Sequence, residues 1–135
     1  MKQILIYGII ALTTFATNAA QLELKKGDHV VLIGNTLAER MQHHGWLETY
    51  LQAEFPQHRL SIRNLGFTGD EVKTRPRSAN FGSPDQWLTK AKADVVLCFF
   101  GYNEALRGEA GLAGFRTNLA AMLTGMKGQK YNGKS

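Results

Sequence analysis

Three short apolar runs divide the sequence, and each ends at or just before a glycine, after which a loop with polar residues begins. They span residues 29–34, 59–65 and 94–100. Near-continuous hydrophobicity over the length of a strand is typical of strands covered on both faces, as in parallel sheets. We therefore expect three parallel strands over these ranges.

A helical pattern fills the segment between the first two runs. Its apolar stripe consists of Leu37, Met41, His44, Leu47, Leu51 and Phe55. These spacings of three and four residues predict one helix over about 36–55, which Pro56 ends. In this stripe His44 can approach Glu48 one turn on, so we expect it to be a boundary histidine rather than a catalytic base.

Two further helices are predicted downstream. Ser83-Pro84-Asp85-Gln86 combines a cap residue, proline at the first helical position and Gln three residues after the cap. Trp87, Leu88 and Ala91 can then face the sheet. A last helix is expected over about 112–123, because Leu112, Phe115, Leu119 and Met122 recur at helical spacing.

The order of these elements predicts an α/β fold, a three-layer αβα sandwich around a parallel sheet with right-handed crossovers. The domain is expected over 28–125. Residues 126–135 are typical of a turn leading from a helix into a further strand. Because doubly wound sheets have about five or six strands, we expect the fold to be incomplete at its C-terminus, as the N-terminal part of a longer protein.

The N-terminus has the pattern of a secretory signal. Met1-Lys2 is basic, residues 4–15 are mostly apolar, and small residues follow up to Ala20. The apolar stretch is shorter than the about 20 residues that span a bilayer. We predict a signal peptide over 1–20, a linker over 21–27, and a protein exported to the periplasm or the extracellular space with no stable membrane span after cleavage.

Charge and ligand chemistry exclude several classes of function. The formal net charge is +5 at pH 7, but the basic residues are scattered, which argues against nucleic-acid binding. Cys98 is the single cysteine, so no intramolecular disulfide can form, and within an apolar run it is expected to pack as a small hydrophobe. The four histidines show no metal-binding spacing. We expect no metal and no cofactor.

Polar loops follow the three predicted strands. They are Gly34-Asn35-Thr36, residues 66–71 and residues 101–104. Loops at the carboxyl ends of parallel strands share one edge of the sheet, where ligands bind. A shared polar pocket is therefore predicted, with Asn35, Asp70 and Glu104 as substrate-binding residues.

The loop after the second strand is long, and such loops are usually functional or mobile. It contains Asp70, Glu71, Arg75 and Arg77. These charged residues either hold the substrate or pair with one another and fix the loop.

The same three loops resemble the sequence blocks of a known family. Gly34-Asn35-Thr36-Leu37 resembles the Gly-Asp-Ser-Leu block of the GDSL esterases and lipases, also called SGNH hydrolases. Residues 64–70 resemble the second block, and Gly101-Tyr102-Asn103-Glu104 resembles the Gly-x-Asn-Asp of the third. The resemblance covers about 28–123 and implies an SGNH, flavodoxin-like fold.

The resemblance also implies catalytic roles at the matching positions. Thr36 stands where the family's serine attacks an ester carbonyl. The oxyanion would be held by the backbone N–H of Thr36, the backbone N–H of Gly69 and the side-chain amide of Asn103. A donor fixed in this way before reaction contributes about 3 kcal/mol to the transition state.

Two departures from the family bear on activity. Threonine replaces serine, so the hydroxyl is secondary and a methyl group crowds the attack path. The family's Asp-x-x-His block, which supplies the base, does not occur in this sequence. Thr36-Leu37-Ala38-Glu39 also reads as a capping box, in which the threonine only starts a helix. Both roles of Thr36 remain open.

These observations predict an exported hydrolase-like domain whose intact form acts on ester bonds, carbohydrate esters among them, and which is inactive as this chain. The expected partner is a small ester or carbohydrate, with a further C-terminal domain in the intact protein. One alternative is a non-catalytic carbohydrate- or ligand-binding module on the same fold. A phosphate or nucleotide site at the first loop is a second, against which the lack of GxGxxG and GxxxxGK[ST] counts.

Overall fold

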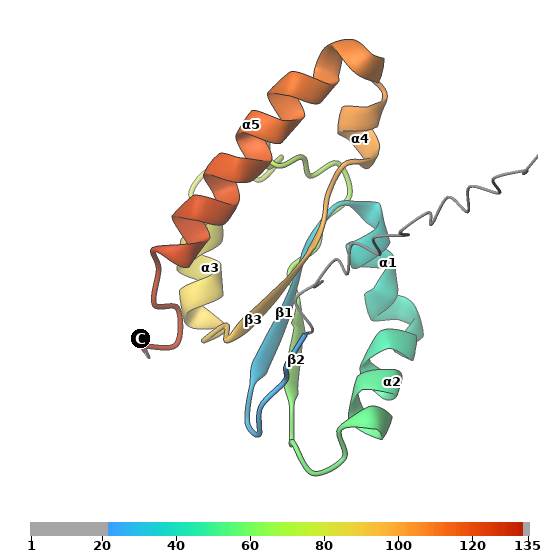
Figure 1. Ribbon diagram of the computed structural model, residues 1–135, viewed down its shortest axis with the longest axis vertical. Coiled ribbons are helices and arrows are strands. Elements are labelled where there is room, and N and C mark those ends of the chain that lie inside the picture. The colour runs from blue at the N-terminus through green and yellow to red at the C-terminus, as the bar shows by residue number, and fades with distance from the viewer. Residues whose placement is uncertain (1–21, 134–135) are drawn as a thin grey trace, which may run out of the picture.

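The computed structural model describes residues 22–133 and is shown in Figure 1. Its centre is a parallel sheet in which β1 (His29–Gly34) lies between β2 (Ser61–Asn64) and β3 (Val95–Phe99). The three predicted strands are thus confirmed, with β2 and β3 slightly shorter than expected. The signal peptide predicted over 1–20 lies outside the described residues.

The central strand explains the continuous apolar run in the sequence. Side chains of β1 alternate between two core clusters, with Val31 and Ile33 in one and Val30 and Leu32 in the other. All four are buried. Because both faces of β1 are covered, its positions from Val30 to Ile33 are all apolar, as expected for a central strand of a parallel sheet.

Two helices cover the face formed by Val30 and Leu32. They are α1 (Thr36–His44) and α2 (Trp46–Glu54), on one side of the sheet in Figure 1. The prediction of a single helix is wrong, because Gly45 ends α1 with φ of 62° and starts α2. Leu37 and His44 of the predicted stripe face solvent instead of the sheet.

The opposite face, formed by Val31 and Ile33, is covered by α3 (Pro84–Lys90) and by part of α5 (Gly108–Lys127). Figure 1 shows both helices on the side away from α1 and α2. The predicted start of α3 is confirmed, since the Ser83 hydroxyl accepts the Gln86 N–H and the Gln86 side chain accepts the Ser83 N–H. Leu88 of α3 is fully buried against the sheet.

The C-terminal part of the chain differs from expectation. A short helix, α4 (Tyr102–Ala105), precedes α5, and α5 extends beyond the predicted 112–123. After α5 the chain returns to the sheet, where Tyr131 is buried in the same cluster as Leu88 and its hydroxyl donates to Asp85. At the other end, Leu24 of the predicted linker is buried in the opposite cluster.

Residues 22–133 therefore form a mixed α/β domain of three parallel strands and five helices. In this part of the chain no helix is both long and apolar enough to cross a membrane. The prediction for Cys98 is wrong, because this residue of β3 is exposed. Partial burial still raises the pKa of its thiol, and the nearby Arg75 charge opposes that rise.

Candidate functional site

The three loops predicted to meet are joined by hydrogen bonds at the carboxyl edge of the sheet. The Gly69 N–H donates to the side-chain oxygen of Asn35 at 2.9 Å, which links the first loop to the second. The Val72 N–H donates to Glu104 at 2.8 Å, which links the second to the third. The three loops, linked through Asn35, Gly69, Val72 and Glu104, thus form one continuous polar cluster, which we call the loop junction.

Close packing at the junction requires two of its glycines. Gly34 has φ of 134°, and a Cβ there would lie 2.2 Å from the Phe99 carbonyl oxygen. A Cβ on Gly66 would lie 2.5 Å from the Ala38 side chain. A side chain at either position would force the loops apart, because no heavy atoms approach that closely without repulsion.

Asn35 is the centre of the junction. Its side chain is only 2% exposed. The side-chain oxygen Oδ1 accepts the Thr36 N–H at 2.7 Å, the Thr36 hydroxyl at 2.9 Å and the Gly69 N–H at 2.9 Å. These three donors fix which end of the amide carries the oxygen. The amide nitrogen Nδ2 points away from them and is buried without a partner among the described residues.

The donors that bind Asn35 are the groups to which the family resemblance assigns catalysis. Thr36 would supply the nucleophile and one oxyanion N–H, and Gly69 would supply a second. In this structure all of them donate to Asn35 Oδ1. A hydroxyl that donates to an amide oxygen is not activated as a nucleophile, because a neutral amide is too weak a base to remove its proton.

No histidine assists the threonine. His29 Nδ1 lies 3.0 Å from the Ala91 carbonyl, at the opposite end of β1, and His43 lies 3.6 Å from Glu39. His44, which we expected beside Glu48, is exposed at the end of α1. Within residues 22–133 none of the histidines hydrogen-bonds Thr36.

The predicted capping box at Thr36 is wrong. The residue that caps α1 is Asn35, and Thr36 is the first residue of the helix. Glu39 does not reach back to the cap but accepts the Thr68 hydroxyl of the second loop, a bond that lowers the pKa of Glu39. Asparagine caps helices as well as threonine does, so the sequence alone left the start of α1 one residue in doubt.

In the third loop, the Glu104 side chain is hydrogen-bonded to the backbone, whereas the Asn103 side chain is available to a ligand. Glu104 is buried, and its carboxylate accepts the Val72 N–H at 2.8 Å and the Gly101 N–H at 3.1 Å. It therefore fixes the turn of the chain after β3. Asn103 beside it is half-buried, and its side chain forms no hydrogen bond with the described part of the chain.

The long loop after β2 is fixed by ion pairs, the second of the two roles we considered. Asp70 is 2% exposed and accepts two hydrogen bonds from Arg77, at 2.7 and 2.9 Å. Arg75 approaches the same carboxylate at 3.6 Å. Glu71 pairs with Arg107 on the surface instead, at 2.7 Å. Bidentate pairing of this kind sets both distance and orientation.

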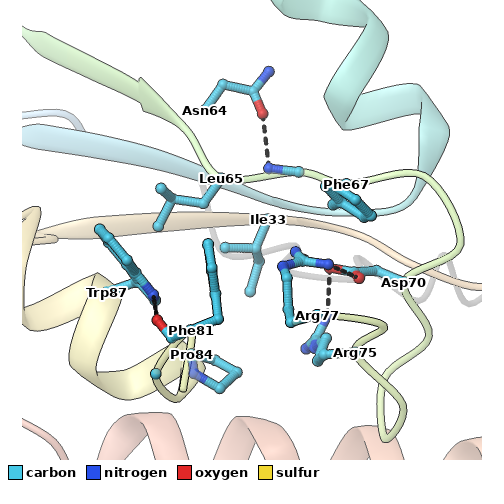
Figure 2. Close-up of a pocket in the computed structure, with 12 residues that line it drawn as sticks. Ile33, Asn64, Leu65, Phe67, Asp70, Arg75, Arg77, Phe81, Pro84 and Trp87 are labelled. Carbon is cyan, nitrogen blue, oxygen red and sulfur yellow. Dashed lines mark hydrogen bonds and ion pairs between the residues drawn. The ribbon is translucent and has the colours of Figure 1, made fainter. Parts of the chain in front are cut away.

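A cavity of about 250 Å³ opens between this loop and α3. Figure 2 shows Asp70 and the two arginines at one end of it. Of the catalytic and substrate-binding residues predicted at the three loops, Asp70 alone lines the cavity, together with the neighbouring Arg75 and Arg77. The rest of the wall is mostly apolar and comes from Ile33, Leu65, Phe67, Phe81, Pro84 and Trp87. The sequence signal for this cavity was aromatic, with Phe67 and Phe81 near the two ends of the long loop and Trp87 in the helix that follows.

The fold and the loop junction define a mixed α/β domain with a buried polar cluster at the carboxyl edge of its sheet. Comparison of the chain with protein-family models, with curated proteins and with solved structures found no match. The relation to SGNH hydrolases therefore rests on the three sequence blocks and stays a prediction.

Proposed function

We propose that this chain is an SGNH-hydrolase-like domain that binds an ester or carbohydrate ligand at the loop junction without hydrolysing it. One observation carries the proposal: Asn35 Oδ1 accepts the Thr36 hydroxyl, the Thr36 N–H and the Gly69 N–H together. The proposal includes the three-layer αβα arrangement of that family, which the helices on both sides of the sheet support, and export, which the sequence of residues 1–20 supports.

Hydrolysis would need these groups in a different state. An ester is attacked by a hydroxyl whose proton a base removes, while N–H donors point at the developing oxyanion. Here the hydroxyl faces an amide oxygen and two of the three expected donors are occupied. Freeing them would leave Asn35 Oδ1 buried without a partner, which costs about 1 to 3 kcal/mol.

Asn103 and Tyr102 of the third loop are the groups that a ligand at the loop junction would contact. The Asn103 amide is half-buried and forms no hydrogen bond with the described residues, so it can donate to an ester carbonyl or a sugar oxygen. Tyr102 beside it is 75% exposed and offers an aromatic face. An amide donor next to an exposed ring is a combination that suits sugars and their esters.

Ester hydrolysis remains the second candidate, and the convergence of the loops favours it. Thr36 lies at the first turn of α1, next to the glycine that the family uses for its oxyanion. Binding of an ester could exchange the Asn35 contacts for contacts to the substrate. The two candidates differ in turnover, so one set of variants separates them.

The test uses the full chain with two probes, acetylated xylobiose for binding and p-nitrophenyl acetate for turnover. We expect the xylobiose ester to shift the NMR signals of Asn103 and its neighbours, and Asn103→Ala to abolish these shifts. We expect the wild type to cleave p-nitrophenyl acetate no faster than Thr36→Val, which has the same shape but no hydroxyl. Wild-type cleavage well above Thr36→Val, raised further in Thr36→Ser, would establish the hydrolase instead.

A further inference from the structure

The cavity between the long loop and α3 has a charged end and an apolar end, as Figure 2 shows. Asp70, Arg75 and Arg77 form the charged end. Leu65 and Trp87 lie at the other end, on the far side of Ile33. None of the cavity-lining residues is Thr36, Gly69 or Asn103, so this space is separate from the residues to which the resemblance assigns catalysis.

The charged end holds two guanidinium groups and one carboxylate, which leaves one positive charge without a full partner. Arg77 is well matched, since it donates to both oxygens of Asp70 and lies over the Phe67 ring at 4.1 Å. Each carboxylate oxygen of Asp70 thus accepts one hydrogen bond from Arg77. Arg77 and Asp70 therefore form a neutral pair, and the uncompensated charge belongs to Arg75.

Among the described residues, Arg75 has only weak partners. Its guanidinium lies 3.6 Å from Asp70, 3.5 Å from the sulfur of Met122 and 4.2 Å from the centre of the Phe100 ring. Its side chain is 15% exposed. Burial lowers the pKa of Arg75, and Asp70 opposes this effect while the charge of Arg77 adds to it. A buried guanidinium in this state gains most from an additional anion.

The apolar end has few polar groups left for a ligand. The Trp87 ring nitrogen donates to the Phe81 carbonyl at 2.9 Å. The Asn64 amide is used twice, as a donor to the Ala38 carbonyl and as an acceptor of the Gly66 N–H. Because these groups are occupied, this end offers a ligand mainly the faces of Leu65, Trp87 and Ile33.

We propose that this cavity binds a small monocarboxylate with an apolar body, with the carboxylate on Arg75 and the body between Leu65 and Trp87. A planar guanidinium can bind a carboxylate through two N–H donors. The volume of about 250 Å³ limits the body to one ring or a short branched chain. This site does not depend on the function proposed for the loop junction and stands if that proposal fails.

The test is a titration of the isotope-labelled full chain with phenylacetate, followed by NMR. We expect saturable shifts at Leu65, Arg75 and Trp87 with a dissociation constant of about 0.1 to 1 mM, a typical value for so small a ligand. Phenylacetamide, which has the same shape without the charge, should bind at least about tenfold more weakly, as should acetate, which lacks the ring.

Arg75→Met keeps an unbranched side chain that matches arginine as far as Nε and removes the charge, and it should weaken phenylacetate binding by about tenfold or more. Arg107→Met is the matched control, because Arg107 is 54% exposed and pairs with Glu71 outside the cavity. It should leave the affinity unchanged. The melting temperature shows whether each variant is folded.

Three results would overturn the proposal. They are no saturable shift at these residues, equal binding of phenylacetate and phenylacetamide, and shifts confined to the loop junction. If Arg75→Met does not fold, the comparison of phenylacetate with phenylacetamide on the wild type still decides, because the two ligands have the same shape and only phenylacetate carries the carboxylate charge that Arg75 would bind.

Discussion

The loop junction and the cavity lie next to each other at the carboxyl edge of the sheet, and they differ in how their polar groups are used. At the junction, Asn35 Oδ1 accepts three donors, so the groups expected to do chemistry are occupied. In the cavity, Arg75 keeps a charge that Asp70 does not neutralise. Polar residues in a loop thus indicate where a polar cluster forms in the structure. Whether that cluster can bind a ligand depends on which of its polar groups still lack a partner.

The largest effect on stability is expected from Asp70→Asn, which tests whether the Asp70 carboxylate compensates the charges of the two arginines in the cavity. Without the carboxylate, Arg75 and Arg77 face each other in a largely buried position, and we expect a loss of about 3 to 5 kcal/mol in the free energy of unfolding. Urea denaturation measures it. Glu71→Gln is the control, since its partner Arg107 is on the surface, and no resolvable change is expected. Equal effects of the two variants would mean that the arginines do not depend on Asp70.

A smaller loss is expected from Asn35→Ala, which tests the junction. This change removes the cap of α1 and leaves the Gly69 and Thr36 donors without an acceptor. The free energy of unfolding should therefore fall by about 2 to 3 kcal/mol. Ser83→Ala removes the exposed cap of α3 and should cost only about 1 kcal/mol. If both alanine variants lose the same amount in urea denaturation, Asn35 is an ordinary cap and not the centre of the junction.

The smallest effect concerns the thiol of Cys98, which senses the charge of Arg75. That charge opposes the burial that raises the pKa of Cys98. In Arg75→Met the pKa should rise further, and alkylation by iodoacetamide at pH 8 should slow by about twofold because less thiolate is present. Arg107→Met should alkylate at the wild-type rate. A faster reaction in Arg75→Met would show that the arginine shields the thiol sterically instead.

The sequence was informative wherever one local pattern decides the structure. The apolar runs predicted all three strands, and most directly β1, whose Val30 to Ile33 are covered on both faces and are all apolar. Ser83, Pro84 and Gln86 predicted the start of α3, because a reciprocal cap involves only neighbouring residues. The alternative in which Asp70 pairs with arginines of its own loop is also correct, since these residues are close in sequence.

The sequence was misleading wherever distant segments decide. Gly45 separates two helices that share one apolar stripe, because a glycine in the left-handed region ends a helix regardless of the periodicity around it. Glu39 binds Thr68 of the second loop rather than the cap of its own helix. Cys98 is exposed although its run is apolar, and the cavity appears only when the long loop folds against α3.

The central claim, that Asn35 occupies the donors to which the family resemblance assigns catalysis, is tested most directly by amide hydrogen exchange at Thr36 and Gly69. We expect both N–H groups to exchange at least about a hundredfold more slowly than in an unstructured peptide, and Asn35→Ala to remove this protection while the Val72 N–H, held by Glu104, stays protected. Exchange of the Gly69 and Thr36 amides at the unprotected rate in the wild type would contradict the claim, because both donors would then be free for an oxyanion.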